Sequence, residues 1–206
     1  MKRALLIIVI IASGIISKTQ AQRTAPDQDP SFQNNSTTAL LLVDIQEFYF
    51  PGGRMALEDP ETAGMNAGLV LERFRDSGMM VIHVRHDFDP GGAIHDLVKP
   101  EEGEKVITKN QVNAFIGTEL LLTLEEHAID QLVICGMQTH MCVEAAVRAA
   151  HDFGYKCLVV EDACATRALQ YKEHIVPAKQ VHYATLSSLS GVYATLVTTD
   201  EFLKTF

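Results

Sequence analysis

The stretch that decides the fold is Leu132-Val133-Ile134-Cys135-Gly136-Met137-Gln138-Thr139-His140-Met141-Cys142-Val143-Glu144. It predicts a buried strand, a glycine turn and then a helix whose first turn carries a thiol. The N–H groups at the start of a helix have no partner within that helix, so they favour negative charge. A cysteine placed there is expected to ionise more readily and to act as a nucleophile. A functional hypothesis therefore starts at Cys142.

The alternation of apolar runs and helical patterns continues along the chain on both sides of this stretch. Strands are predicted over 39–43, 80–84, 105–108, 131–135, 156–160 and 193–198, and helices over 61–77, 118–126, 139–153 and 177–189. Apolar strands separated by helices are typical of a parallel sheet covered on both faces. We therefore expect an α/β fold, a Rossmann-like three-layer αβα sandwich around a six-stranded, mostly parallel sheet, over residues 38–206.

The composition narrows the number of domains and the class of partner. A chain of 206 residues, 47% hydrophobic and 21% charged, fits one domain with a substantial core. A net charge of −9 disfavours binding to nucleic acid or to an anionic membrane surface. The expected partner is a small molecule.

The amino-terminal residues are typical of an export signal. Met1-Lys2-Arg3 precedes an apolar run over 4–16, which is short for a membrane-spanning helix, and small residues lead up to Ala21. We expect a signal peptide over 1–21 cleaved after Ala21, a flexible segment over 22–37, and a periplasmic or secreted protein. An uncleaved membrane anchor is the alternative.

Export makes four cysteines compatible with disulfide bonds, yet their positions favour packing. Cys135 and Cys157 lie inside apolar runs, and Cys164 is predicted to lie in a turn. Buried cysteine usually behaves as a small hydrophobic residue. A disulfide among these three residues is the alternative.

Three chemically complementary residues follow predicted strands. Asp44, Lys109 and Cys142 come after the first, third and fourth strands, and ligands of parallel sheets bind beyond the carboxyl ends of strands. A carboxylate can accept a thiol proton, an ammonium favours negative charge, and a thiolate attacks carbonyl carbon. Taken singly, the three have ordinary alternatives as a turn cap, a solvated lysine and a packed cysteine. Together they predict an acyl-transfer site.

At these residues the chain resembles the isochorismatase-like cysteine hydrolases, over nearly the whole predicted domain. The resemblance lies in the Asp-x-Gln segment over 42–48, the lysine segment over 109–118, the nucleophile motif over 136–143, and the segments 148–150, 154–155 and 162–167. Asn113 departs from the pattern, because the family often has serine there.

The resemblance implies a catalytic triad of Asp44 as general base, Lys109 as the polarising and orienting group and Cys142 as the nucleophile that forms a thioester. It further implies a cis peptide bond between Met137 and Gln138, with an oxyanion hole made by the N–H groups of Gln138 and Cys142. Family members form homo-oligomers, in which a neighbouring subunit can close the pocket, so we expect a homo-oligomer here.

The sequence lacks the metal ligands of one branch of this family. Nicotinamidases carry an aspartate and two histidines shortly after the first strand, and residues 48–53 hold neither type. His86, Asp87 and His95 are irregularly spaced for a different metal site. We expect no metal and no cofactor.

Candidate substrate-pocket residues are Gln46, Phe48, Phe50, Arg85 and His86, which follow the first two strands. Phe48 and Phe50 could equally fill the core, and Gln46 could cap its loop. The leading hypothesis is a cysteine hydrolase that cleaves a C–N bond of a small carboxamide, carbamoyl or cyclic amide. The alternatives are vinyl-ether hydrolysis of the isochorismatase type, and a non-catalytic thiol redox sensor or binding protein.

Overall fold

The computed structural model describes residues 37–206. The predicted signal peptide, and all but the last residue of the predicted flexible segment, lie outside the described residues. Within residues 37–206, no helix has the length and apolar character needed to cross a membrane.

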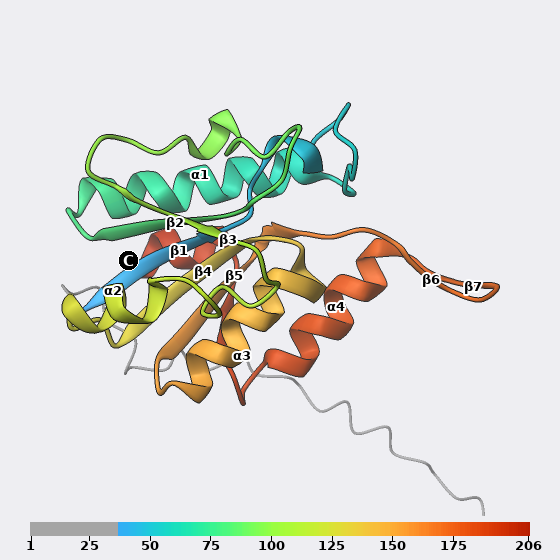
Figure 1. Cartoon of the computed structure of the whole chain (residues 1–206). Coiled ribbons are helices and arrows are strands. Elements are labelled where there is room, and N and C mark those ends of the chain that lie inside the picture. The colour runs from blue at the N-terminus through green and yellow to red at the C-terminus, as the bar shows by residue number, and fades with distance from the viewer. Residues whose placement is uncertain (1–36) are drawn as a thin grey trace, which may run out of the picture.

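The core of the molecule is one six-stranded sheet, and Figure 1 shows helices packed on both of its faces. All neighbouring strands are parallel, and their order is β3-β2-β1-β4-β5-β8. The strands are β1 (Thr38–Val43), β2 (Met80–His86), β3 (Lys105–Lys109), β4 (Gln131–Met137), β5 (Lys156–Ala165) and β8 (Thr195–Val197). The predicted α/β sandwich is confirmed.

Within residues 37–206, five α-helices form the two outer layers. Helices α1 (Pro60–Asp76) and α5 (Thr199–Thr205) cover one face of the sheet, and α2 (Leu120–Glu126), α3 (Glu144–Asp152) and α4 (Ala178–Leu189) cover the other (Figure 1). The rings of Phe74 on α1 and Phe202 on α5 stack with centroids 6.1 Å apart, which fixes the carboxyl-terminal helix against α1.

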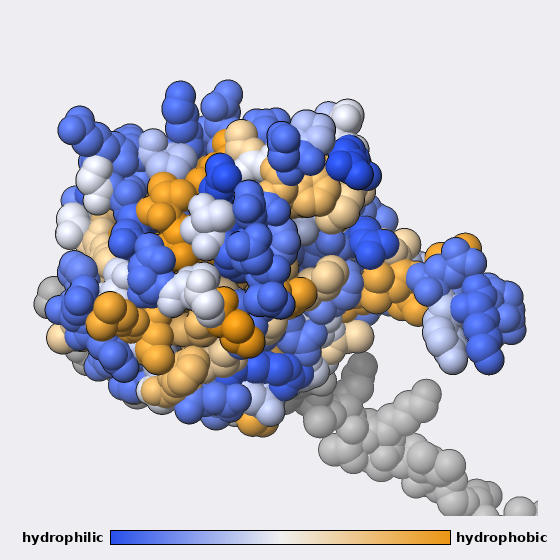
Figure 2. All heavy atoms as spheres, viewed as in Figure 1, coloured by the Kyte–Doolittle hydropathy of each residue, from blue (hydrophilic) through white to orange (hydrophobic). Residues whose placement is uncertain are grey.

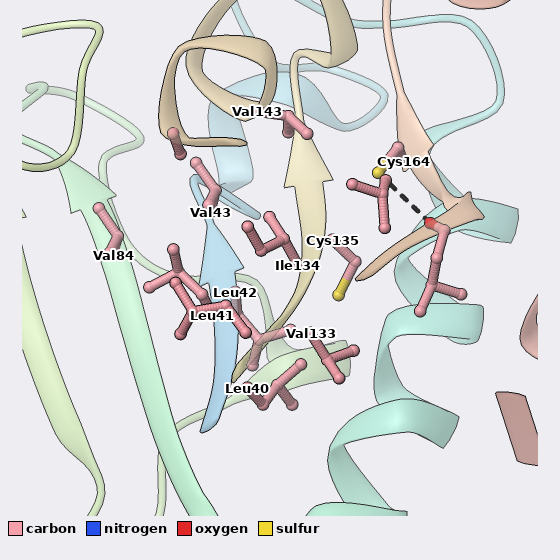
Figure 3. Packing of buried hydrophobic residues seen from close by; sticks show 14 of the residues in the cluster. Leu40, Leu41, Leu42, Val43, Val84, Val133, Ile134, Cys135, Val143 and Cys164 are labelled. Atoms are coloured by element: carbon pink, nitrogen blue, oxygen red, sulfur yellow. Dashed lines mark hydrogen bonds between the residues drawn. The ribbon is translucent and has the colours of Figure 1, made fainter. Parts of the chain in front are cut away.

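The two central strands explain why the sequence contains continuous apolar runs. Strands β1 and β4 lie side by side, and their side chains are buried on both faces of the sheet (Figure 3). A strand that is buried on both faces needs apolar residues at every position, not at alternate ones. The neighbouring residues Leu40 and Leu41 on β1, and Val133 and Ile134 on β4, point to opposite faces of the sheet and are all fully buried.

Several element boundaries differ from the sequence predictions. Strand β5 continues to Ala165, so Cys164 lies in a strand and not in a turn. The single helix predicted over 139–153 is divided into a π-helical turn, η3 (Thr139–Val143), and α3.

The sequence analysis missed α5, the 3-10 turns η1 (Glu47–Tyr49) and η2 (Asp96–Val98), and a hairpin of β6 (Leu169–Tyr171) and β7 (His174–Val176). Helix α5 begins with a capping box between Thr198 and Glu201, which the sequence pattern Thr-x-x-Glu could have revealed.

All four cysteines are buried and free. The prediction that Cys135 and Cys157 pack as small hydrophobic residues is confirmed, and Cys164, which was predicted to lie in a turn, is buried as well. The Cys164 thiol lies 3.4 Å from the Val160 carbonyl oxygen, the contact drawn as a dashed line in Figure 3.

Gly136 allows a close approach between the backbones of β1 and β4. Its φ is +138°, and a Cβ atom added there would lie 2.0 Å from the Val43 carbonyl oxygen and 2.8 Å from the Val43 carbonyl carbon. The obstructing atoms are backbone, so they cannot move aside as a flexible side chain would. The pairing of the two strands that carry the site therefore requires glycine.

We predict that Gly136→Ala lowers the free energy of unfolding by about 3 kcal/mol or more, because the methyl group pushes β1 from β4. Gly78→Ala is the matched control, since Gly78 also has a positive φ, +62°, but no atom within 4 Å of the added Cβ. The control should lose only about 1 to 2 kcal/mol from backbone strain. Urea denaturation measures both, and equal losses would contradict the close-approach explanation.

Candidate active site

The site lies where the chain reverses its direction of travel across the sheet. From β1 the chain moves outward to β2 and β3, and it then returns to β4 on the other side of β1. In parallel sheets this arrangement opens a crevice beyond the carboxyl ends of the two central strands. Asp44 directly follows β1 and Cys142 follows β4, so the topology brings the two residues to one place.

Asp44 is held at the end of β1 by a sharp change of backbone direction. Its φ is +51°, and its N–H donates to the Val84 carbonyl oxygen at 2.8 Å. The side chain is fully buried. Its carboxylate therefore has a fixed direction and no access to bulk water.

Lys109 reaches the same place from β3, two strands away from β1. Its side chain is fully buried, and Nζ lies 2.6 Å from Asp44 Oδ2, 3.1 Å from His86 Nδ1 and 3.3 Å from Cys142 Sγ. The contact with Asp44 is an ion pair, and those with His86 and Cys142 are hydrogen bonds. Lys109 thus connects the carboxylate, the imidazole and the thiol.

Cys142 lies inside the π-helical turn. The Gln138 carbonyl accepts hydrogen bonds from the N–H groups on both sides of the cysteine, Met141 at 3.0 Å and Val143 at 3.3 Å. This wide turn aims the thiol back toward Asp44 and Lys109.

The Cys142 thiol keeps its proton in the resting site. Burial, and next the nearby Asp44 charge, raise its pKa to about 12, although Lys109 acts in the opposite direction. The expectation that a helix start makes this thiol easy to ionise is therefore wrong for the resting site. Desolvation outweighs the helix-terminal effect.

The pKa of Asp44 is also raised, because burial disfavours its charged form more than the Lys109 ammonium and the Cys142 thiol favour it. A carboxylate with a raised pKa is a stronger base than an ordinary aspartate. The neighbouring thiol and carboxylate are therefore suited to exchange one proton.

His86 completes the surroundings of Lys109. Burial and the Lys109 charge lower its pKa, so the imidazole is neutral at pH 7. Because Nδ1 accepts from the Lys109 ammonium, the remaining hydrogen is on Nε2. The structure thus brings His86 into contact with the predicted triad.

The turn between β4 and Cys142 contains a cis peptide bond between Met137 and Gln138. The buried Gln138 side chain donates from Nε2 to the Tyr49 hydroxyl at 3.3 Å and accepts at Oε1 from Arg167 Nε at 3.2 Å. Sequence reasoning left this side chain without a role and missed both partners. Arg167 lies in the 162–167 segment of the family resemblance, which was the available signal.

Two further side chains of the same turn form hydrogen bonds with residues of other segments. Thr139 Oγ1 lies 2.9 Å from His182 Nδ1 on α4, and His140 Nδ1 lies 2.6 Å from Thr166 Oγ1. His140 is therefore directed at Thr166. The turn is fixed by contacts with α4 and with the residue that directly follows β5, as well as by its own backbone.

The structure favours structural roles for three of the five candidate pocket residues. Gln46 is buried, accepts from the His86 N–H at 2.8 Å, and donates to the carbonyl oxygens of His86 at 2.9 Å and Gly92 at 2.8 Å. Its amide has no hydrogen left for a substrate, which favours the loop-cap interpretation. Phe48 and Phe50 are also buried, as core filling requires.

Arg85 differs from these three because it is only partly buried. Its Nε has no hydrogen-bond partner among the described residues. Of the five candidates, His86 alone has a contact with Lys109 recorded in residues 37–206.

The histidines considered for a metal site have other partners. His95 Nδ1 accepts from the Leu97 N–H at 3.2 Å, and its ring stacks on Phe50 with centroids 3.6 Å apart. In the described part of the chain, no group of three His, Cys, Asp or Glu side chains is arranged to hold a metal ion.

Comparison with known proteins identifies the family of this chain. The family model described as the isochorismatase domain matches residues 38–201. The uncharacterised isochorismatase family protein YddQ of Bacillus subtilis is 50% identical over 179 residues, which cover 82% of this chain and 99% of that protein.

Two further relatives are informative. The crystal structure of a protein from Oleispira antarctica assigned as an isochorismatase hydrolase has a TM-score of 0.79 and 42% identity, covering 84% of this chain and 99% of that one. Maleamate amidohydrolase of Pseudomonas putida is 26% identical over 191 residues, covering 81% of this chain and 85% of that enzyme. With the family model matching most of its length, this chain belongs to the isochorismatase family of hydrolases.

Proposed function

We propose that this hydrolase cleaves the C–N bond of a small carboxamide, carbamoyl or cyclic amide through a thioester on Cys142. The observation that carries the proposal is the position of Lys109 Nζ, 2.6 Å from Asp44 Oδ2 and 3.3 Å from Cys142 Sγ in a buried site. A buried base, a buried cation and a thiol within reach of one another are the groups that acyl transfer needs. The similarity to an enzyme named for amide hydrolysis supports the same reaction class.

In the first half-reaction Asp44 accepts the thiol proton while sulfur attacks the substrate carbonyl carbon. The N–H groups of Gln138 and Cys142 donate to the oxyanion that forms. When the C–N bond breaks, Asp44 returns the proton to the departing nitrogen, leaving a thioester.

In the second half-reaction Asp44 takes a proton from water, and the oxygen of that water attacks the thioester carbonyl. The carboxylic acid leaves as the C–S bond breaks, and the proton on Asp44 returns to sulfur. The enzyme is then ready for another cycle.

Lys109 orients these groups. Its ammonium forms an ion pair with Asp44 and hydrogen bonds with His86 and Cys142, so its charge acts on the carboxylate and on the sulfur. We assign it the stabilisation of negative charge on either partner as the proton moves between them.

The redox-sensor alternative finds less support. Oxidant sensing needs an exposed thiol that is readily ionised, whereas Cys142 is 5% exposed and has a pKa raised to about 12.

We predict that Cys142→Ala loses at least about a thousandfold in turnover of its best amide substrate, because the nucleophile is gone. Ammonia or amine release from a panel of small amides, ureido acids and cyclic amides measures this, and isochorismate in the panel tests the vinyl-ether alternative. Cys135→Ala is the matched control, since that thiol is buried outside the site. Undiminished hydrolysis by Cys142→Ala would exclude the thioester mechanism.

The pH profile distinguishes general-base attack from a preformed thiolate. As pH falls through the raised pKa of Asp44, the base is protonated, so kcat/KM should fall with a midpoint above the ordinary aspartate value of 3.8. At higher pH the rate should reach a plateau, because Asp44 removes the thiol proton during attack. A rate that still rises about tenfold per unit up to about pH 9 would instead indicate that free thiolate is required.

Removing the Lys109 charge should also destabilise the fold. Lys109→Met leaves a buried carboxylate without its counter-charge, and we expect a loss of about 3 to 5 kcal/mol in the free energy of unfolding. The double variant Lys109→Met with Asp44→Asn removes that charge and should recover most of the stability while remaining inactive. Thermal or urea unfolding measures this, and equal stability of the single and double variants would contradict a charge-balance role.

A further inference from the structure

The hydroxyl group of Tyr49 is placed beside the candidate active site by contacts on three sides. Tyr49 is the last residue of the turn η1, and its N–H donates to the Gln46 carbonyl oxygen at 3.0 Å. Its own carbonyl oxygen accepts from the Leu57 N–H at 2.9 Å, and its hydroxyl contacts the Gln138 side chain at 3.3 Å. Tyr49 thus joins the segment that follows β1 to the turn that follows β4.

The direction of the hydrogen bond at this hydroxyl follows from Arg167. A guanidinium group can only donate, so the side-chain oxygen of Gln138 must accept from Arg167 Nε, which lies 3.2 Å away. The nitrogen of the same amide therefore faces Tyr49 and donates to the hydroxyl oxygen. The hydroxyl acts as an acceptor in this contact, and its own hydrogen is left for another partner.

That hydrogen has no acceptor among residues 37–206. The hydroxyl has its recorded hydrogen bond with Gln138, and neither carboxylate oxygen of Asp44 accepts a hydrogen bond from it. Tyr49 is only 4% exposed, and in Figure 2 side chains cover the strands that are visible in Figure 1. Most buried polar groups in folded proteins are paired, because an unpaired one is costly. The hydroxyl therefore has unused capacity to donate.

The Tyr49 hydroxyl is an uncharged donor at neutral pH. Burial raises its pKa more than the hydrogen bond from Gln138 lowers it, and negative charge on Asp44 or Cys142 raises the pKa further. The hydroxyl is therefore close enough to Asp44 and Cys142 for their charges to act on it. An uncharged buried donor suits an uncharged acceptor, since burying an anion would require a counter-charge as well.

We propose that the Tyr49 hydroxyl determines specificity by donating a hydrogen bond to a second carbonyl oxygen of the substrate. The proposal rests on the proposed amide hydrolysis and narrows its substrate class to amides that carry another carbonyl group near the scissile one. The scissile carbonyl oxygen is already assigned to the N–H groups of Gln138 and Cys142, so the hydroxyl serves a different oxygen. An analogue without this oxygen leaves the buried hydroxyl unpaired, and the site therefore disfavours it.

Matched pairs of amides test the proposal. Malonamide, succinamide and glutaramide each carry a second carbonyl group. Butyramide, pentanamide and hexanamide have the same chain length, with CH2 and CH3 in place of the second C=O and its NH2. The wild type should prefer its best diamide over the matched simple amide by at least about a hundredfold in kcat/KM. Tyr49→Phe keeps the ring and should reduce this preference at least about tenfold.

Tyr155→Phe is the matched control. It removes the hydroxyl of another buried tyrosine, which directly precedes β5 and so lies at the amino ends of the strands, away from the site. The control should leave the preference unchanged. Equal losses for both members of a pair in Tyr49→Phe would indicate a structural or oxyanion role and overturn the proposal. A wild type without preference for any diamide would overturn it too.

Binding to Cys142→Ala separates this proposal from the thioester mechanism, because binding needs no turnover. Calorimetry should give a Kd for the best diamide at least about tenfold below that of its matched simple amide, and adding Tyr49→Phe should remove most of this difference. Such binding by a protein that hydrolyses no amide would support the hydroxyl's role and contradict only the proposed hydrolysis. Failure to bind any diamide, or binding without discrimination, would overturn the role of the hydroxyl even if amides are hydrolysed.

Discussion

The buried contact between Lys109 and Asp44 is the constraint on which the rest of the site depends. Taking two charges out of water costs several kcal/mol for each, and the cost is tolerated only when the charges are close and well partnered. Lys109 meets this condition through its ion pair with Asp44 and its hydrogen bonds with His86 and Cys142. The same contact therefore sets the geometry of the proposed triad and balances the buried charges.

The sheet is built so that this contact can form. Lys109 lies on β3 and Asp44 at the end of β1, with β2 between them, so a long side chain has to cross one strand. The close pairing of β1 and β4 at Gly136 brings the turn that carries Cys142 to the same point. Contacts from Tyr49 and Arg167 then fix the Gln138 side chain in that turn. The strands that stabilise the fold therefore also position the residues of the site.

Burial also changes the kind of chemistry that the thiol can perform. A thiol whose pKa is raised to about 12 is protonated at neutral pH. To act as a nucleophile, it needs a base that removes its proton as the new bond forms. The same burial makes Asp44 more basic, because it disfavours the carboxylate charge. Desolvation thus makes the Cys142 thiol unreactive on its own, whereas it makes Asp44 a stronger base that can take the thiol proton during attack.

The sequence by itself determined the sheet, because strands buried on both faces must be continuously apolar, and it placed Asp44, Lys109 and Cys142 at strand ends. It could not indicate the raised pKa of the Cys142 thiol, nor that both N–H groups of the Gln46 amide already have partners. Both properties depend on which groups surround a side chain in space. It also missed the hairpin of β6 and β7, whose strands are three residues long and have no buried face that would require alternating apolar residues. Local patterns specify elements, whereas desolvation and hydrogen-bond partners arise only when distant elements meet.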